Sequence, residues 1–225
     1  MHWLGLGGYD NLWPIHLAAM FCRDVSKIIE KMVANKQDPN LPTNRGWTPL
    51  LLAARFGHFE IIKNLVKFVE NPNEPCQLGR TPISYAAANG HLEIVQFLVN
   101  CTVNPNVPDI DGRTPIHKLA ARTPIPKMAD DVRNHPIATA NQKYLEILKI
   151  LIANTEKPNV ADNKGWTPIH AAAVKGNTDV VKILVEYAET PNAEDDDWQT
   201  PLQLAKRLGH NEIVKILQKN SVLRV

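Results

Sequence analysis

The sequence contains few cysteines and no long apolar run. Its three cysteines, Cys22, Cys76 and Cys101, are odd in number and lack paired spacing. This argues against a disulfide framework and against a zinc site. No segment is apolar over the length of a membrane span, and the first residues lack the basic region and apolar core of a secretory signal. We therefore expect a protein of a reducing compartment, the cytoplasm or alternatively the nucleus.

A strong net charge and catalytic motifs are also missing. The 25 basic and 23 acidic residues leave a formal net charge of +2, too little to indicate binding to nucleic acid or to an acidic membrane. The sequence has no GxxxxGK[ST] or GxGxxG loop, and no Ser, Cys or carboxylate stands in a recognisable nucleophile pattern. We expect no enzyme activity and no cofactor.

What the sequence does contain is a recurring Thr-Pro dipeptide. Threonine supplies the oxygen of a helix N-cap, and proline presets φ for the first helical position, so each dipeptide predicts a helix start. The interval is 33 residues, except for one of 53, and an imperfect copy, Trp13-Pro14, stands 35 residues before the first. The dipeptides begin at Thr48, Thr81, Thr114, Thr167 and Thr200.

The stretch 81–109 shows what one interval encodes. After Thr81-Pro82, a short helix with a small apolar face is predicted to end at Gly90. A second helix is predicted over 92–99, with Ile94 and Val95 on its apolar stripe. Helices this short are not stable alone in water, so they must pack against neighbours. The sequence therefore predicts a stack of helix pairs.

This pattern resembles the ankyrin repeat over roughly residues 10–220. The resemblance rests on the period of 33 residues, a TPLH-like start, paired alanines, a Gly-His turn and an EIVKIL-like second helix. The resemblance implies an all-α solenoid of stacked helix-turn-helix units with projecting β-hairpin loops, monomeric, with a concave partner-binding groove. We predict a single domain, 1–225. Its six repeats are predicted at about 10–42, 43–75, 76–108, 109–161, 162–194 and 195–225.

The fourth repeat carries an insertion of about 20 residues, at 123–143. This segment contains three prolines and little helical periodicity, so we predict a long loop before a second helix at 145–152. A loop of this kind is either functional or a tolerated insertion.

The connectors between repeats share a Pro-Asn dipeptide, before which each second helix must end. Proline there is expected to replace the glycine that usually ends this helix in ankyrin repeats. At the last hairpin, Trp198 stands at the turn-glycine position, so this tip should differ from the others.

Two sets of histidines recur. His16, His117 and His170 share the position after Thr-Pro-x (Trp-Pro-Ile for the first), which raises a metal hypothesis. Residues in register along a stack do not converge on one ion, so we expect no metal site. The resemblance implies instead that these imidazoles bond to hairpin or threonine groups. His58, His91 and His210 begin second helices and are also predicted to be structural.

Residues that vary between equivalent repeat positions are the candidates for partner binding. In the resembled family, hairpin tips and the ends of first helices line the concave surface, and solvent-facing Trp and Arg are typical of interface hot spots. In the alternative, the tryptophans pack on adjacent hairpins, and stacking of Arg on Trp fits both. The candidates are Arg45, Trp47, Arg55, Phe56, Gln77, Leu78, Arg80, Asn89, Ile110, Arg113, Arg122, Asn163, Lys164, Trp166 and Lys175.

We thus predict a non-enzymatic scaffold that binds a protein or peptide with acidic and apolar features in a groove from Trp47 to Trp166. Replacing Trp47, Arg80 and Arg113 by alanine should abolish binding and leave the thermal melt nearly unchanged. A second hypothesis is binding of a polyanion or anionic membrane by Arg45, Arg55, Arg80, Arg113 and Lys164. A third, from resemblance alone, is hydroxylation by an asparaginyl hydroxylase at Asn40, Asn73, Asn106, Asn159 and Asn192.

Overall fold

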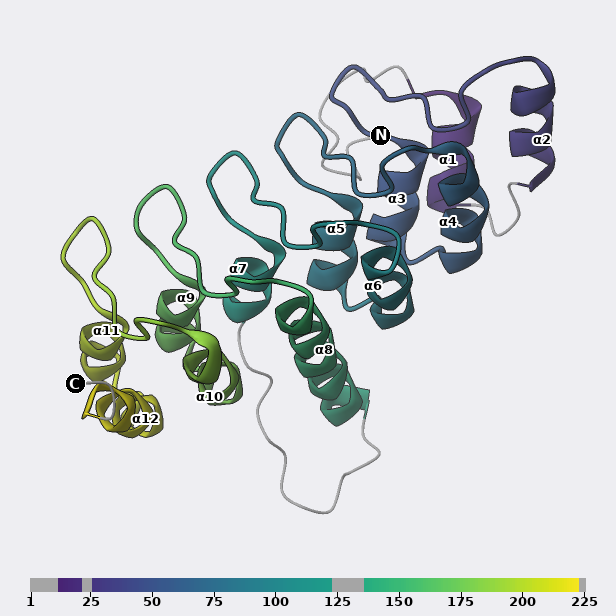
Figure 1. Ribbon diagram of the computed structural model, residues 1–225. Coiled ribbons are helices and arrows are strands. Elements are labelled where there is room, and N and C mark those ends of the chain that lie inside the picture. Colours follow the sequence, from purple (N-terminus) through teal and green to yellow (C-terminus); the bar gives the residue numbers. More distant parts are fainter. Residues whose placement is uncertain (1–11, 22–25, 123–135, 223–225) are drawn as a thin grey trace. The chain divides into compact units, whose positions relative to one another are not determined.

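The computed structural model describes residues 12–21, 26–122 and 136–222, and among these it contains helices and loops but no strand (Figure 1). The chain divides into two compact units, which we call unit 1 (Met1–Val103) and unit 2 (Asn104–Val225). The single domain over residues 1–225 and the six repeat boundaries stay predictions.

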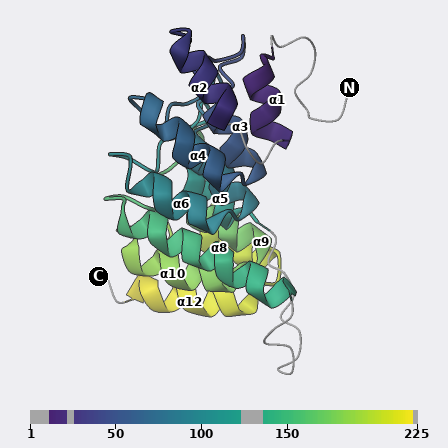
Figure 2. The same cartoon turned by 90° about the vertical axis from the view of Figure 1, so that its right-hand side faces the viewer.

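Unit 1 contains three helix pairs. The first helices, α1 (Pro14–Phe21), α3 (Pro49–Phe56) and α5 (Pro82–Asn89), pack side by side in chain order. The second helices, α2 (Ser26–Ala34), α4 (Phe59–Leu65) and α6 (Leu92–Val99), form a second row, in which a short 3₁₀ turn, Val66–Phe68, continues α4 (Figure 2). This is the stack of short helices that the repeat period predicts.

Unit 2 repeats the arrangement. Its first helices are α7 (Pro115–Ala120), α9 (Pro168–Lys175) and α11 (Pro201–Arg207), and its second helices are α8 (Pro136–Ala153), α10 (Thr178–Tyr187) and α12 (Asn211–Val222). Helix α9 packs against α7, α10 and α11, so the interior of unit 2 lies around it. Ile169, Ala172 and Ala173 of α9 are fully buried there.

Helix starts are held as the Thr-Pro dipeptides predict, with help from the connector asparagines. In α5, proline at the first position has no N–H, the N–H of Ile83 donates to Oδ1 of Asn73 at 3.1 Å, and the N–H of Ser84 donates to Oγ1 of Thr81 at 3.1 Å. All three positions of the first turn are thereby satisfied. Asn40, Asn106, Asn159 and Asn192 accept equivalent bonds at 2.9–3.4 Å.

The hairpins are narrow turns with a single bridging pair of main-chain groups. In the first, the N–H of Thr43 donates to the carbonyl of Trp47 at 2.9 Å, and the N–H of Gly46 donates back to Thr43 at 2.9 Å. Four later hairpins, at 76–80, 109–113, 162–166 and 195–199, repeat both bonds. The predicted projecting hairpins are confirmed, although none of their described residues forms a regular strand.

The predicted loop over 123–143 is wrong in its second half. Helix α8 begins at Pro136, not near 145, so residues 136–143 are helical. Proline is favourable at a first helical position, and the Ala, Gln and Lys that follow are good helix formers, so this segment needs no apolar stripe to extend α8. Residues 123–135 lie outside the described ranges.

Second helices end before the Pro-Asn dipeptides, as predicted, but proline does not replace the left-handed turn everywhere. Lys36 takes a φ of +56° just after α2, which is uncommon for a residue with a side chain. At the equivalent Val69 the backbone is extended, with φ −121°. The helix ends of unit 1 therefore differ from one another, although their connectors share the same dipeptide.

Candidate functional site

The recurring histidines are structural, as predicted. The Nδ1 atom of His170 accepts from the N–H of Thr167 at 3.1 Å, and its Nε2–H donates to the carbonyl of Gln199 at 3.0 Å. His117 bonds to Thr114 and to the carbonyl of Trp166 in the same way, at 3.1 and 2.9 Å. Each imidazole thus ties a helix start to the next hairpin, in the neutral Nε2–H tautomer that these partners require.

Burial keeps these imidazoles neutral. It is the main cause that lowers the pKa of His117 and of His170, against hydrogen bonds to the carbonyls of Trp166 and Gln199, which raise it. The pKa of His91 is also lowered by burial. Its Nε2 is 3.2 Å from the carbonyl of Arg55, so it too links two repeats.

Trp47 is the clearest error of the sequence-based site. Its side chain is 7% exposed, and its ring centroid lies 5.1 Å from that of Tyr85. It is therefore part of the packed interior and not a solvent-facing anchor, and its ring lies against Tyr85 of helix α5, whereas the alternative placed it on an adjacent hairpin. Because removing a buried tryptophan leaves a cavity, we now expect its replacement to lower the melting temperature, in contrast to the prediction from the sequence.

The buried tryptophan supports an arginine in unit 1. The guanidinium carbon of Arg55 lies 5.3 Å from the ring centroid of Trp47, and 5.7 Å from those of Phe56 and Tyr85. We call these four residues the Arg55 cluster. Arg55 and Phe56 end α3, Trp47 precedes its cap, and Tyr85 comes from α5. Sequence comparison of the repeats missed Tyr85, whose position holds aliphatic residues or lysine in the other repeats.

Residues of the second hairpin lie near this cluster. Arg80 is half-buried and bonds to the hydroxyl of Tyr85. Burial raises the pKa of that hydroxyl, while the bond and charge of Arg80 oppose the rise. At the hairpin tips, Gln77 is exposed and donates from Nε2 to the carbonyl of Asn44 at 2.7 Å. Arg45 and Leu78 are exposed on the same tips, and Asn89 is exposed at the end of α5.

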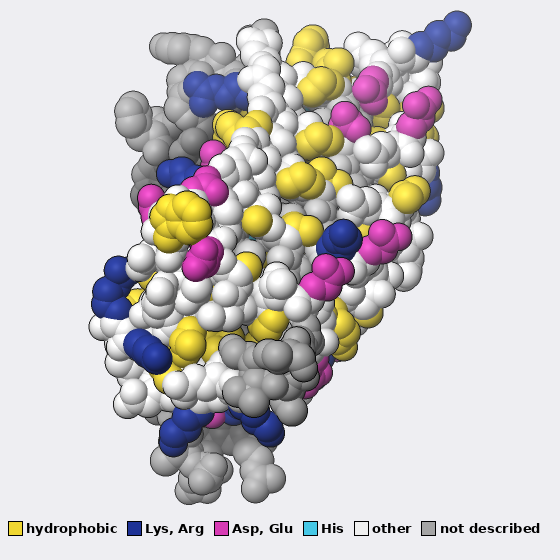
Figure 3. Space-filling view, turned by 60° about the vertical axis from the view of Figure 1, so that its left-hand side comes forward, with side chains coloured by type: hydrophobic (Ala, Val, Ile, Leu, Met, Phe, Trp, Pro, Cys, Tyr) yellow, Lys and Arg dark blue, Asp and Glu magenta, His cyan; other side chains and the backbone are white. Residues whose placement is uncertain are grey.

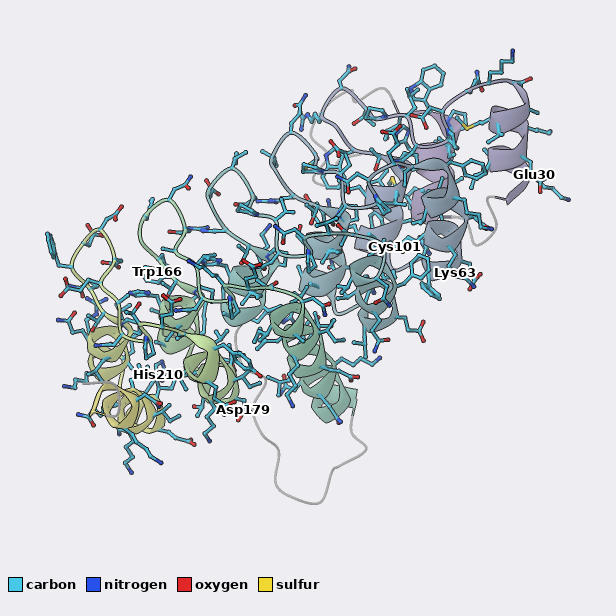
Figure 4. The ribbon with its side chains drawn as sticks, viewed as in Figure 1. Glu30, Lys63, Cys101, Trp166, Asp179 and His210 are labelled. Atoms are coloured by element: carbon cyan, nitrogen blue, oxygen red, sulfur yellow. The ribbon has the colours of Figure 1, made fainter. Side chains whose placement is uncertain are left out.

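The candidates in unit 2 are mostly engaged within the unit. The Nε of Arg113 lies 3.2 Å from Oδ2 of Asp162, whose carboxylate is 1% exposed. Burial would raise the pKa of Asp162, but main-chain N–H groups and Arg113 lower it below its ordinary value. Trp166, which Figure 4 labels, is half-buried. Its ring centroid lies 5.2 Å from that of His170. Arg122 lies over the ring of Tyr144 at 3.6 Å.

The remaining candidates of unit 2 are exposed: Ile110, Asn163, Lys164 and Lys175. Asn163 donates to the carbonyl of Ile110 at 2.9 Å and so joins two hairpin tips. Lys118, which was not a candidate, pairs with Asp109 at 3.1 Å. Arg113, one of the five cations of the polyanion hypothesis, is thus paired with a carboxylate, and that hypothesis finds no support here.

The connector asparagines are occupied by main-chain bonds. Asn73 is 2% exposed and Asn106 is 6% exposed, and both accept from the second residue of a helix. The hydroxylation hypothesis finds no support in this arrangement.

The described ranges contain no group of three His, Cys, Asp or Glu side chains arranged to hold a metal ion. No helix within those ranges has both the length and the apolar character needed to cross a bilayer.

Comparison with known proteins agrees with the stacked helix pairs. The sequence matches the family described as ankyrin repeats (3 copies) over residues 15–109 and 137–223. The structure is similar to the crystal structure of an ankyrin repeat domain from Acinetobacter baumannii AYE, with a TM-score of 0.73 and 25% sequence identity, covering 92% of this chain and 97% of that one. A search of curated proteins found no match.

Proposed function

The chain belongs to the ankyrin repeat family, and on that premise we propose that it is a scaffold that holds a partner protein against the Arg55 cluster of unit 1. Ankyrin repeats generally mediate protein–protein interaction, and the fold is in general a non-enzymatic scaffold. The observation that carries the proposal is the support of one arginine by three aromatic rings, at 5.3–5.7 Å.

This support prepares the guanidinium for a ligand. Stacking on rings stabilises the cation by roughly 0.5–1 kcal/mol at an exposed site, and it restricts the side chain before a partner arrives. The N–H groups of arginine point outward in its plane, so a guanidinium beside aromatic rings can also bond to a carboxylate. Less side-chain entropy is then lost on binding than for an unsupported arginine.

The surroundings of the cluster indicate the partner's chemistry. Arg45 and Arg80 come from the adjoining hairpins of unit 1, while Phe56 and Leu78 add partly or fully exposed apolar surface. A segment with carboxylates and one or more apolar side chains complements this combination. The partner is therefore proposed to be an acidic, partly apolar peptide segment, as the sequence hypothesis had it. Extension of the groove to Trp166 stays a prediction.

Selection from a displayed random peptide library, followed by calorimetric titration of the enriched peptides, tests the proposal. Enriched peptides should contain Asp or Glu beside apolar residues. Arg55→Ala should weaken their binding by about tenfold or more, which is the loss expected for a hot-spot arginine. Arg55→Lys should fall between, because lysine keeps the charge but loses the planar fork.

Lys67→Ala is the matched control, since Lys67 is an exposed cation in the 3₁₀ turn after α4. It should bind the peptides like the unmodified chain. Equal losses in Arg55→Ala and Lys67→Ala would show a general charge effect and would refute the cluster as the site. Measuring the binding at increasing salt concentration distinguishes the peptide site from the polyanion alternative, because binding driven by phosphate groups weakens steeply with salt.

A further inference from the structure

The tip of the last hairpin, 194–198, carries a tryptophan at a position where the four other hairpins have glycine. Gly46, Gly79, Gly112 and Gly165 have φ of 70–79°, and Trp198 has the same left-handed conformation with φ +59°. Such a conformation costs a residue with a side chain about 1–2 kcal/mol, and glycine avoids this cost. Trp198 is therefore less favourable for folding than glycine would be.

Packing explains why a side chain is permitted there but not why it is tryptophan. A Cβ on Gly165 would come within 2.9 Å of the main-chain nitrogen of Asp196, because the next hairpin packs against it. Trp198 is 75% exposed, so no described residue covers it in this way. Exposure removes the steric constraint but gives the ring no partner, and a large exposed apolar side chain gains nothing from folding.

Hydrogen bonds hold the backbone of this tip in place. Oδ1 of the buried Asp195 accepts from the N–H of Asp197 at 3.0 Å and from the N–H of Gln199 at 2.8 Å. The N–H of Trp198 donates to the carbonyl of Asp195 at 3.0 Å, and the N–H of Asp196 donates to the carbonyl of Lys164 at 3.1 Å. The indole thus projects from a fixed tip.

Three exposed carboxylates closely precede this position in the chain. Glu194, Asp196 and Asp197 are all exposed, and none of them takes part in an ion pair with another described residue. On the face shown in Figure 3, acidic side chains lie next to exposed hydrophobic ones. Carboxylates this close in the chain that have no ion-pair partner among the described residues repel one another, so they too do not stabilise the fold.

We propose that the 194–198 tip docks a basic segment of a partner protein, with a Lys or Arg side chain over the ring of Trp198 and its neighbouring cations opposite the three carboxylates. Trp is the side chain that binds a cation over its face best. The exposed acids select a cationic partner and repel nucleic acid and anionic lipid. This site lies in unit 2, is independent of the Arg55 cluster, and differs from it in the charge of its ligand.

The test uses the full chain and a fluorescent peptide of alternating Gly with Lys and Arg, with a second peptide in which Glu replaces each cation. Fluorescence anisotropy should detect binding of the basic peptide only. Trp198→Gly should weaken it by about tenfold or more. The same variant should keep or raise the midpoint of thermal unfolding, because glycine relieves the left-handed strain. A loss of binding with unchanged or higher stability is what a merely structural tryptophan would not produce.

Two further variants complete the design. Asp196→Asn combined with Asp197→Asn should also weaken binding, while Glu186→Gln, which removes an exposed carboxylate of α10, should not change it. The indole N–H signal that Trp198→Gly removes from an NMR spectrum should be the one that shifts when the basic peptide is added. Unchanged binding in Trp198→Gly, equal binding of an uncharged apolar peptide, or a Trp198-dependent dimer of the chain in sedimentation analysis would each overturn the proposal.

Discussion

Replacing Trp47 with alanine should lower the free energy of unfolding by about 3–5 kcal/mol, the usual range for removing a buried tryptophan. The structure supports this magnitude, because the side chain is 7% exposed. A buried aromatic side chain removes about 150–250 Å² from water, which corresponds to roughly 4–6 kcal/mol at 25 cal/mol per Å². These two estimates overlap, and the second is an upper bound because the unfolded chain already buries some of this surface.

Specific contacts add to the area term. The contact of the Trp47 and Tyr85 rings, with centroids 5.1 Å apart, contributes about 0.5–1.5 kcal/mol beyond burial. Arg55 over the Trp47 ring contributes a further amount of about 0.5–1 kcal/mol. Both are lost in Trp47→Ala, so the effect should fall in the upper part of the range. Trp47→Phe keeps an aromatic ring beside Tyr85 and should lose less than half as much.

Urea unfolding followed by circular dichroism measures the effect, with the slope of each transition compared between variants. Hydrogen exchange locates it, and α3 and α5 should lose most of their protection because their side chains form the cluster. Trp198→Gly is the control, since both variants remove an indole but only one removes it from an interior. A loss below about 1 kcal/mol in Trp47→Ala would mean that the site is not a packed interior and would refute the reasoning.

Three further predictions concern residues that recur along the chain. The pKa of His117 and of His170 is lowered in the folded state from the ordinary histidine value of 6.5. Below pH 6.5 the unfolded state therefore binds more protons than the folded state. The free energy of unfolding should consequently fall on acidification through pH 6.5. The double variant His117→Gln, His170→Gln should make the melting temperature depend less on pH across that range. Glutamine can replace these histidines because Gln203 already accepts the N–H of Thr200 at the equivalent position. An unchanged pH dependence of the melts would contradict this prediction. Asn73→Ala should cost about 1–3 kcal/mol in urea unfolding, because it leaves the buried N–H of Ile83 without its acceptor, whereas replacement of the exposed Asn89 should cost far less. Gly57→Ala should lower the thermal stability more than Gly209→Ala. Both glycines have positive φ, but a Cβ on Gly57 would lie 2.5 Å from the His91 ring, whereas one on Gly209 would meet no atom within 4 Å. Equal shifts of the melting temperature would show that the backbone conformation alone decides the cost.

Short-range patterns predicted the frame because the interactions that hold it are short in sequence. Thr81 caps a helix whose third residue is Ser84, and Asn73 reaches a helix only ten residues ahead. Such contacts repeat with the period and can be recognised in any copy. The start of α8 could not be predicted in this way, because the segment at 136–143 has helix-forming residues without the apolar stripe that marks a packed helix.

Trp47 and Trp166 show why the candidate site was less predictable. Both precede the capping threonine of a helix, so the repeat pattern treats them as equivalent. Trp47 is covered because Arg55 in its own repeat and Tyr85 in the next one lie against it, whereas the corresponding positions after Trp166 hold Val174 and Leu204. Trp166 lies instead beside the ring of His170, where the first of these repeats has Leu51, and it stays half-buried. The burial of a side chain in a stack is thus decided by pairs of residues from adjoining repeats, and alignment of the repeats position by position does not compare such pairs.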